Sequence, residues 1–296
     1  MINEELENKI EIFRDSYDID PSVKDLIKKA KFPYVCEEVY KEAISSILAG
    51  KNLLLVGDKS TGKNVLAENL AYLFNRPLWT SSFHINIDAY DLIGGDTLKN
   101  GKIIFRPGPI YKAAKYGGFG VLDEINMAKN EAIAVLHEIL DYRRMLEIPG
   151  YENLKLHPAT RFIATMNYDY EGTRDLNEAL LSRFVIIQMP IIKKDDLKLL
   201  IKSQYKNMKD EYIDNFTSFF FDLRLKVENG ELLTVSPDLR SLFDSFDLIK
   251  EGLNLKNALK LTVVNKSFDE FEKKLIEDLI MTRFKDRTYY KDVFNE

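Results

Sequence analysis

The sequence has a single cysteine, Cys36, and only three histidines among its 296 residues. A lone cysteine cannot form an intramolecular disulfide or a metal site that needs several cysteines. The histidines, His84, His137 and His157, are scattered without the spacing of metal ligands. These absences exclude a disulfide scaffold, speak against a histidine metal centre, and fit the reducing cytoplasm.

Long apolar runs are also missing, since none approaches the ~18 residues that cross a membrane. The first seven residues are acidic and lack the basic start and apolar run of a signal peptide. The chain also lacks an excess of positive charge. Its 42 Lys and Arg residues are outnumbered by 47 Asp and Glu residues, which gives a net charge of −5. We therefore expect a soluble, cytoplasmic protein that has no membrane contact and for which nucleic acid is not the favoured partner.

Apolar residues are plentiful enough for a large core, at 45% of the chain. Segments that read as strands lie at 53–56, 78–82, 120–122, 162–165 and 185–187, and the apolar runs among them are typical of strands buried on both faces. Helical patterns at 37–48, 66–74 and 133–140 separate them. This alternation predicts an α/β core with a parallel sheet covered by helices.

Strand patterns stop at about Ile192, and helical patterns follow at 197–205, 212–227, 239–249 and 268–284. The first thirty residues are charged and helix-forming, with a break at Asp20-Pro21. We therefore divide the chain into an N-terminal helical adaptor (1–30), an α/β core (31–191) and a smaller all-helical domain (192–296). Pro190 marks the hinge between the last two.

The most informative segment is Gly57-Asp58-Lys59-Ser60-Thr61-Gly62-Lys63-Asn64, which follows an apolar strand and precedes a helix. Its glycines allow the backbone N–H groups to turn toward an anion, and Lys63 can reach the outer phosphates of a nucleoside triphosphate. The last position departs from the pattern, because the usual Ser or Thr hydroxyl that binds Mg²⁺ is replaced by the Asn64 amide, a poorer but usable ligand. The segment predicts a phosphate-binding loop.

Polar side chains follow two further predicted strands. Asp123 comes first after an apolar run and can hold Mg²⁺ directly or through water, whereas Glu124 can polarise the water that attacks the γ-phosphate. Asn167 follows the strand at 162–165 and can orient that water without titrating. Because such strand ends open onto the ligand crevice, we expect these groups beside the phosphate-binding loop.

Arginines complete the candidate site. Arg183 stands just ahead of the fifth predicted strand, and Arg240 begins a helix of the C-terminal domain. A guanidinium group suits the charge that develops on a transferring phosphate. Arg174 competes with Arg183 for this role.

In this order, these features resemble an AAA+ ATPase, a P-loop NTPase whose three-layer core is followed by a helical lid. The resemblance implies Walker A at 57–64, Walker B at 121–124, Asn167 as sensor 1, Arg183 as arginine finger and Arg240 as sensor 2. More narrowly, residues 30–245 resemble the MoxR-like and dynein-related branch. The segments that carry this narrower resemblance are 91–95, 105–110, 122–126 and 176–184.

The resemblance implies ATP and Mg²⁺ as cofactors and a ring, usually a hexamer, in which Arg183 acts on the neighbour's nucleotide. It also implies a chaperone-like remodelling of a partner protein, often one with a von Willebrand factor A domain or a metalloenzyme awaiting assembly. In that branch an inserted β-hairpin faces the pore, and residues 97–105, with Asn100-Gly101 at the turn, have hairpin chemistry. A second hairpin is expected at 145–148 and 154–156.

Two other hypotheses stay open. The first is a nucleotide-dependent DNA motor subunit, as in the McrB-like restriction GTPases or a phage-encoded relative, against which the acidic charge counts. The second is a nucleotide-sensing scaffold with negligible hydrolysis, in which Asn64 has weakened Mg²⁺ binding. The sequence does not identify the base, so ATP is inferred from the family alone.

Overall fold

A computed structural model describes residues 3–148, 150–167, 176–233 and 237–295, without the side chains of Asn130 and Glu131. The chain forms two compact units, Met1–Pro190 and Ile191–Glu296, which are treated separately below. Within the described ranges, no helix is both long and apolar enough to cross a membrane.

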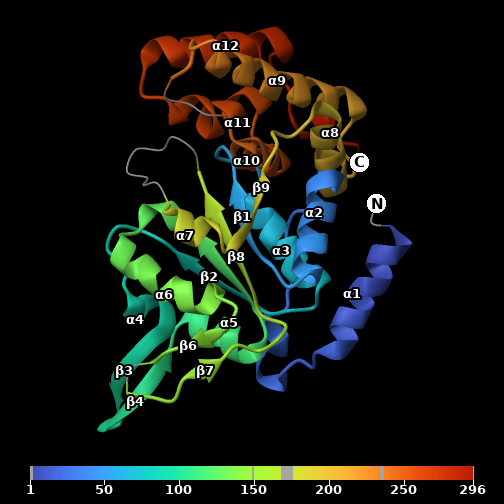
Figure 1. The fold of residues 1–296 in the computed structure, drawn as a ribbon. Coiled ribbons are helices and arrows are strands. Elements are labelled where there is room, and N and C mark those ends of the chain that lie inside the picture. Colours follow the sequence, from blue (N-terminus) through green and yellow to red (C-terminus); the bar gives the residue numbers. More distant parts are fainter. Residues whose placement is uncertain (1–2, 149, 168–175, 234–236, 296) are drawn as a thin grey trace. The chain divides into compact units, whose positions relative to one another are not determined.

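A parallel five-stranded sheet is the centre of the first unit (Figure 1). Its strands, in spatial order, are β2 (Leu78–Ser82), β5 (Phe119–Asp123), β8 (Arg161–Met166), β1 (Asn52–Val56) and β9 (Phe184–Gln188). All five expected strands are confirmed. β2 has the predicted bounds, and each of the other four is one or two residues longer than predicted.

Helices cover both faces of this sheet, and β1 shows how. Leu53 and Leu55 belong to an apolar cluster with α1 (Glu4–Ser16), α2 (Glu37–Leu48) and α3 (Lys63–Leu73). Leu54 and Val56 point the other way, into a cluster with α4 (Ala89–Ile93), α5 (Pro109–Tyr116), α6 (Asn130–Leu140) and α7 (Glu178–Leu181). The alternation of side chains along a strand thus builds the predicted three-layer core.

Strand register determines which ends lie together. Val56 is in register with Met166, and Leu122 with Ala164, so β1, β5 and β8 end at one edge of the sheet. By contrast, Phe184 is in register with Asn52, the first residue of β1. Residues that follow β1, β5 and β8 therefore gather at one edge, whereas those just before β9 lie at the opposite edge.

Two antiparallel hairpins project from the first unit. In the longer one, β3 (Gly94–Lys99) pairs with β4 (Lys102–Pro107) around Asn100-Gly101, where both residues have positive φ, as a two-residue turn requires. The shorter one pairs β6 (Met145–Leu146) with β7 (Leu154–Lys155), which is less strand than expected. The Tyr151 hydroxyl donates a hydrogen bond to the Asp96 carboxylate, so the two hairpins are in contact.

The N-terminal segment packs on the α2 and α3 side of the sheet. Ile10 and Phe13 of α1 are buried in the same cluster as Leu53. A 3₁₀ helix, η1 (Pro21–Leu26), follows the predicted break, with Asp20 as its N-cap. That residues 1–30 act as an adaptor stays a prediction.

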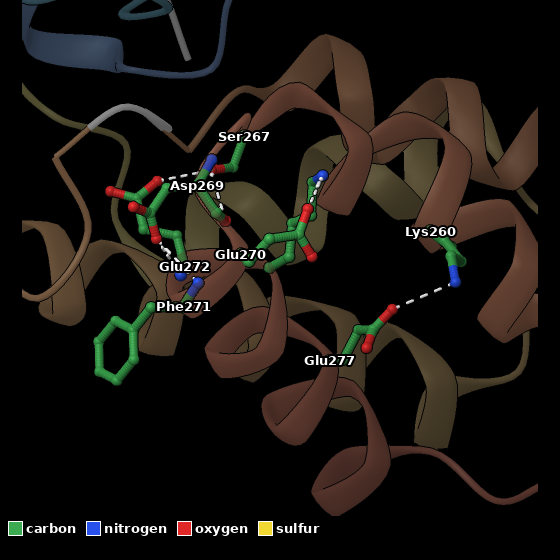
Figure 2. A network of polar contacts seen from close by, with 8 residues as sticks. Lys260, Ser267, Asp269, Glu270, Phe271, Glu272 and Glu277 are labelled. Carbon is green, nitrogen blue, oxygen red and sulfur yellow. Dashed lines mark hydrogen bonds and ion pairs between the residues drawn. The ribbon is translucent and has the colours of Figure 1, made fainter.

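The second unit is helical. It contains α8 (Lys194–Gln204), α9 (Asp210–Glu228), α10 (Leu239–Lys250), α11 (Leu255–Thr262), η3 (Val264–Lys266), α12 (Glu270–Arg283) and α13 (Tyr290–Val293). Figure 2 shows how α12 begins: Asp269 caps it by accepting from the N–H groups of Phe271 and Glu272. The buried Glu272 carboxylate accepts from the Ser267 hydroxyl at 2.7 Å, which holds the preceding turn.

Candidate functional site

The loop between β1 and α3 has the shape of an anion cradle. Ser60 and Gly62 both have left-handed backbone, with φ of 63° and 84°, which turns successive N–H groups toward one side. Gly62 immediately precedes α3, so the positive end of that helix faces the same region. At Gly57 the requirement is space, because an added Cβ would lie 2.9 Å from the Met189 carbonyl oxygen.

Lys63 is the buried cation of this loop, and only 8% of it is exposed. Its ammonium donates to the carbonyl oxygens of Gly57 at 2.9 Å and Asp58 at 2.8 Å. Burial lowers the pKa of Lys63 to about 8, although the negative charges of Asp58, Asp123 and Glu124 oppose that shift. The folded loop thus contains a partly desolvated positive charge that an anion would stabilise.

Asp123, at the end of β5, is held by two donors, one on each carboxylate oxygen. The Thr165 hydroxyl donates to Oδ1 at 2.6 Å, and the Asn64 amide nitrogen donates to Oδ2 at 3.0 Å. Asn64 is the second residue of α3, directly after the last loop residues, so this contact joins the phosphate-binding loop to the end of β5. The carboxylate orientation is therefore fixed from both sides.

Glu124 leaves the strand direction through a left-handed conformation, with φ 56° and ψ 46°. Such a conformation is uncommon for a residue with a side chain and often occurs at functional sites. The Asn167 amide nitrogen donates to Glu124 Oε1 at 3.2 Å, and the Asn126 amide in turn donates to the Asn167 carbonyl at 3.1 Å. A carboxylate and an amide thus lie side by side beyond the strand ends.

The site chemistry fits a Mg²⁺–nucleotide complex. Asn64 Oδ1 is buried and has no hydrogen-bond partner within the described part of the chain, so an oxygen ligand remains available beside Asp123. No group of three or more His, Cys, Asp or Glu side chains suited to a metal occurs in that same part. Mg²⁺ suits such a site, because it is commonly held by one or two protein oxygens together with phosphates and water.

Arg183 lies away from this cluster. It directly precedes β9, at the edge of the sheet opposite the phosphate-binding loop, and it contacts the Ala179 carbonyl and, at 3.8 Å, the Asp141 carboxylate. The five residues of β1 separate the two edges by roughly 16 Å. Arg240 belongs to the second unit, where its exposed side chain stands in the first turn of α10. Arg174 falls outside the described residues.

The segment from Phe32 to Cys36 runs beside the loop. The Asn69 side chain of α3 donates to the Phe32 carbonyl at 2.8 Å, and the Tyr34 ring lies 3.5 Å from where a Cβ of Gly62 would stand. A backbone segment with an aromatic ring next to the phosphate cradle suits a nucleoside base. Contacts between this segment and the base stay a prediction.

The structure brings Lys63, Asn64, Asp123, Glu124 and Asn167 together at one edge of the sheet, as the sequence predicted. Sequence reasoning missed Thr165, which joins Asp123 to Glu124, because a threonine within a strand looks like an ordinary β-former. It also missed Asn126, whose side-chain amide donates a hydrogen bond to the Asn167 carbonyl. Their positions in the sequence could have indicated both residues, because Thr165 stands two residues before Asn167 and Asn126 stands two residues after Glu124.

Fold and site together define a P-loop nucleoside triphosphatase with a helical C-terminal lid. The model of the AAA domain, dynein-related subfamily, matches residues 52–184. This protein belongs to the dynein-related branch of the AAA+ ATPases. Members of this family bind and hydrolyse nucleotide and typically assemble into oligomeric rings.

Relatives extend the match over nearly the whole chain. The uncharacterized protein YojN of Bacillus subtilis is 34% identical over 95% of this chain and 93% of its own length. The uncharacterized protein SH1500 of Staphylococcus haemolyticus is 37% identical over 84% of this chain and 96% of its own length. A solved structure of a candidate ATPase from Cytophaga hutchinsonii is 16% identical, with a TM-score of 0.48, over 99% of this chain and 91% of that one.

Proposed function

We propose that this protein is a MoxR-like ATPase that hydrolyses ATP with Mg²⁺ in a ring and uses the cycle to remodel or activate a partner protein. The observation that carries the proposal is the cluster at the sheet edge, where a buried lysine, a fixed aspartate, a glutamate and an amide converge. Residues 57–64 would bind the phosphates, and Asn64 and Asp123 would hold Mg²⁺. Bound Mg²⁺ would offset the charge on the phosphates.

In this proposal Glu124 accepts a proton from the attacking water, and Asn167 fixes the orientation of the Glu124 carboxylate through its 3.2 Å hydrogen bond. Lys63 neutralises the outer phosphates. Arg240, from the helical lid, would contact the nucleotide as sensor 2. The whole protein is expected to act in the cytoplasm, as a hexamer.

The location of Arg183 supports the ring. Because it lies a strand's length from the loop of its own chain, it is better placed to reach the nucleotide of a neighbour than its own. Its Nε is buried without a hydrogen-bond partner among the described residues, so its present contacts leave a donor unused. A guanidinium supplied by a neighbour would make turnover depend on assembly.

The exposed apolar tip of the longer hairpin supports a protein partner. Leu98 and Ile103 face each other across β3 and β4 and are 74% and 72% exposed. Large apolar side chains at a projecting tip suit contact with another polypeptide. We propose that this partner is a protein substrate of the ring, of the kind that carries a von Willebrand factor A domain.

The proposal is tested by measuring phosphate release from ATP and from GTP by the purified protein, with Mg²⁺ and with EDTA, while mass photometry follows assembly. Faster release from ATP than from GTP, abolished by EDTA and accompanied by rings, is expected. A protein that binds neither nucleotide would refute the proposal. Preference for GTP together with stimulation by DNA would favour the McrB-like alternative.

Arg183→Ala is expected to lower turnover roughly 100-fold or more with little change in nucleotide affinity, because the finger acts on the transition state. Arg143→Ala is the matched control, since Arg143 also pairs with Asp141, at 3.7 Å, without being a candidate finger. Mixing Arg183→Ala with Glu124→Gln protein should restore part of the turnover, because each variant supplies what the other lacks. Absence of any recovery in mixed rings would rule out action on a neighbour.

Asn64→Thr tests whether the amide limits the metal site. We expect the Mg²⁺ concentration for half-maximal turnover to fall roughly tenfold, because a hydroxyl is a compact ligand and threonine lacks the amide that bonds Asp123. Asn64→Ala, without any side-chain ligand, should raise that concentration. A large gain in maximal turnover for the threonine variant would support the scaffold hypothesis for the natural chain, and an unchanged Mg²⁺ dependence would show that position 64 does not bind the metal.

A further inference from the structure

One buried hydroxyl contacts both acidic residues of the site. Thr165 lies in β8, is 1% exposed, and donates from Oγ1 to Asp123 Oδ1 at 2.6 Å. The same oxygen accepts from the backbone N–H of Glu124 at 2.9 Å. A single group therefore links the side chain of Asp123 to the backbone of Glu124.

The second of these bonds supports an unusual backbone. Glu124 has positive φ, a conformation that residues with a side chain rarely adopt. Its partly buried N–H group would otherwise be left unpaired, which proteins avoid. This turn brings the Glu124 carboxylate to the Asn167 amide, so Thr165 helps to determine where the carboxylate lies.

The first bond gains importance from the residue at position 64. Asn64 stands where a Ser or Thr is usual, so position 64 supplies no hydroxyl group. Among the described side chains, the hydroxyl group that contacts Asp123 is that of Thr165. Thr165 and Asn64 hold different oxygens of the same carboxylate. Removal of the Thr165 hydroxyl would free Oδ1 while Asn64 still bonds Oδ2.

We propose that Thr165 is a positioning residue that fixes the metal-binding carboxylate and the catalytic carboxylate together. The inference rests on the proposed function, since it assumes that Asp123 binds Mg²⁺ and that Glu124 activates water. Loss of the hydroxyl should weaken Mg²⁺ binding and slow hydrolysis at the same time. Affinity for nucleotide without metal should not change, because the phosphate-binding loop keeps its contacts.

The experiment compares Thr165→Val, which has nearly the same shape, with Thr165→Ser, which keeps the hydroxyl. Thr160→Val is the matched control: Thr160 is also fully buried, and its hydroxyl donates to the Ala113 carbonyl at 2.9 Å, before the start of β8. Each protein is assayed for kcat, KM, the Mg²⁺ concentration at half-maximal turnover and the affinity for a fluorescent ATP analogue in EDTA. Melting temperatures check that each variant is folded.

For Thr165→Val we expect kcat to fall roughly 10- to 100-fold and the half-maximal Mg²⁺ concentration to rise several-fold, with unchanged affinity in EDTA. Thr165→Ser should stay within about threefold of the natural protein, and Thr160→Val close to it. If Thr165→Val does not fold, Thr165→Ala provides a second variant without the hydroxyl.

Three outcomes overturn the inference, and they can be told apart. If the natural protein hydrolyses ATP and Thr165→Val matches Thr160→Val in kcat and in Mg²⁺ dependence, the positioning role is wrong and the proposed function stands. If the natural protein binds no nucleotide, the proposed function fails and the inference fails with it. Weakened binding of Thr165→Val in EDTA would also contradict a role confined to the two carboxylates.

Discussion

Glu124→Gln protein is expected to bind nucleotide with the affinity of the natural protein and to release phosphate roughly 100- to 10,000-fold more slowly. Glutamine has the shape of glutamate, and its carbonyl oxygen can still accept the hydrogen bond from Asn167. What it cannot do is take a proton from water. Single-turnover phosphate release, together with binding of a fluorescent nucleotide, separates these two effects.

Glu68→Gln, which changes an exposed carboxylate on α3, is the control for the loss of one negative charge. It should hydrolyse ATP at close to the natural rate. If Glu124→Gln retains ordinary turnover, Glu124 is not the base. If Glu124→Gln loses nucleotide binding instead, Glu124 helps to maintain the structure of the phosphate-binding site. The slow variant should also retain the proposed partner protein for longer, which makes it the variant to use for isolating such a partner.

Lys63→Met is expected to weaken nucleotide binding by roughly 100-fold, because it removes the charge that meets the outer phosphates. Methionine retains an unbranched apolar stem and fills most of the same space. The folded protein should tolerate it, since the buried ammonium of Lys63 is itself partly desolvated. Equilibrium binding and melting temperature distinguish a lost contact from a lost fold, and unchanged affinity would remove Lys63 from the phosphate site.

The pH dependence of stability gives Lys63 a second test. Its pKa in the folded protein is lowered to about 8 from 10.5, so between these values the unfolded chain holds the extra proton. In that window the free energy of unfolding of the natural protein should therefore rise with pH relative to that of Lys63→Met. Below pH 8 both states hold the proton, and the difference between the two proteins should be constant. Denaturant titrations across pH 7 to 10 would measure this, and parallel curves throughout would contradict a buried ammonium.

Three strands of the central sheet, β1, β5 and β8, were predictable because they are buried on both faces and contain short apolar runs, whereas β2 and β9 are partly exposed. Their spatial order was not, since no local pattern records which strand lies beside which. In the second unit α11 escaped prediction, because its apolar side consists of Leu255, Ala258 and Leu259 within only eight residues. Short helices of this kind owe their stability to packing more than to sequence propensity.

The candidate site was predictable where a residue ends a strand or follows it directly, as Asp123 and Asn167 do. It was not predictable where a residue acts through another. Thr165 resembles any β-branched residue of a strand, and its two bonds depend on the left-handed turn at Glu124, which no sequence pattern requires. The edge of the sheet at which Arg183 lies also emerged only from the register of β9 with β1.

The close approach of Gly57 to Met189 joins the cradle to the end of the sheet. Met189 donates its N–H to the Val56 carbonyl at 2.7 Å, and it directly precedes Pro190, the last residue of the first unit. No room exists for even a methyl group between position 57 and the Met189 backbone. A side chain at position 57 would therefore displace either the loop or the segment at Met189, through which the chain leaves the sheet.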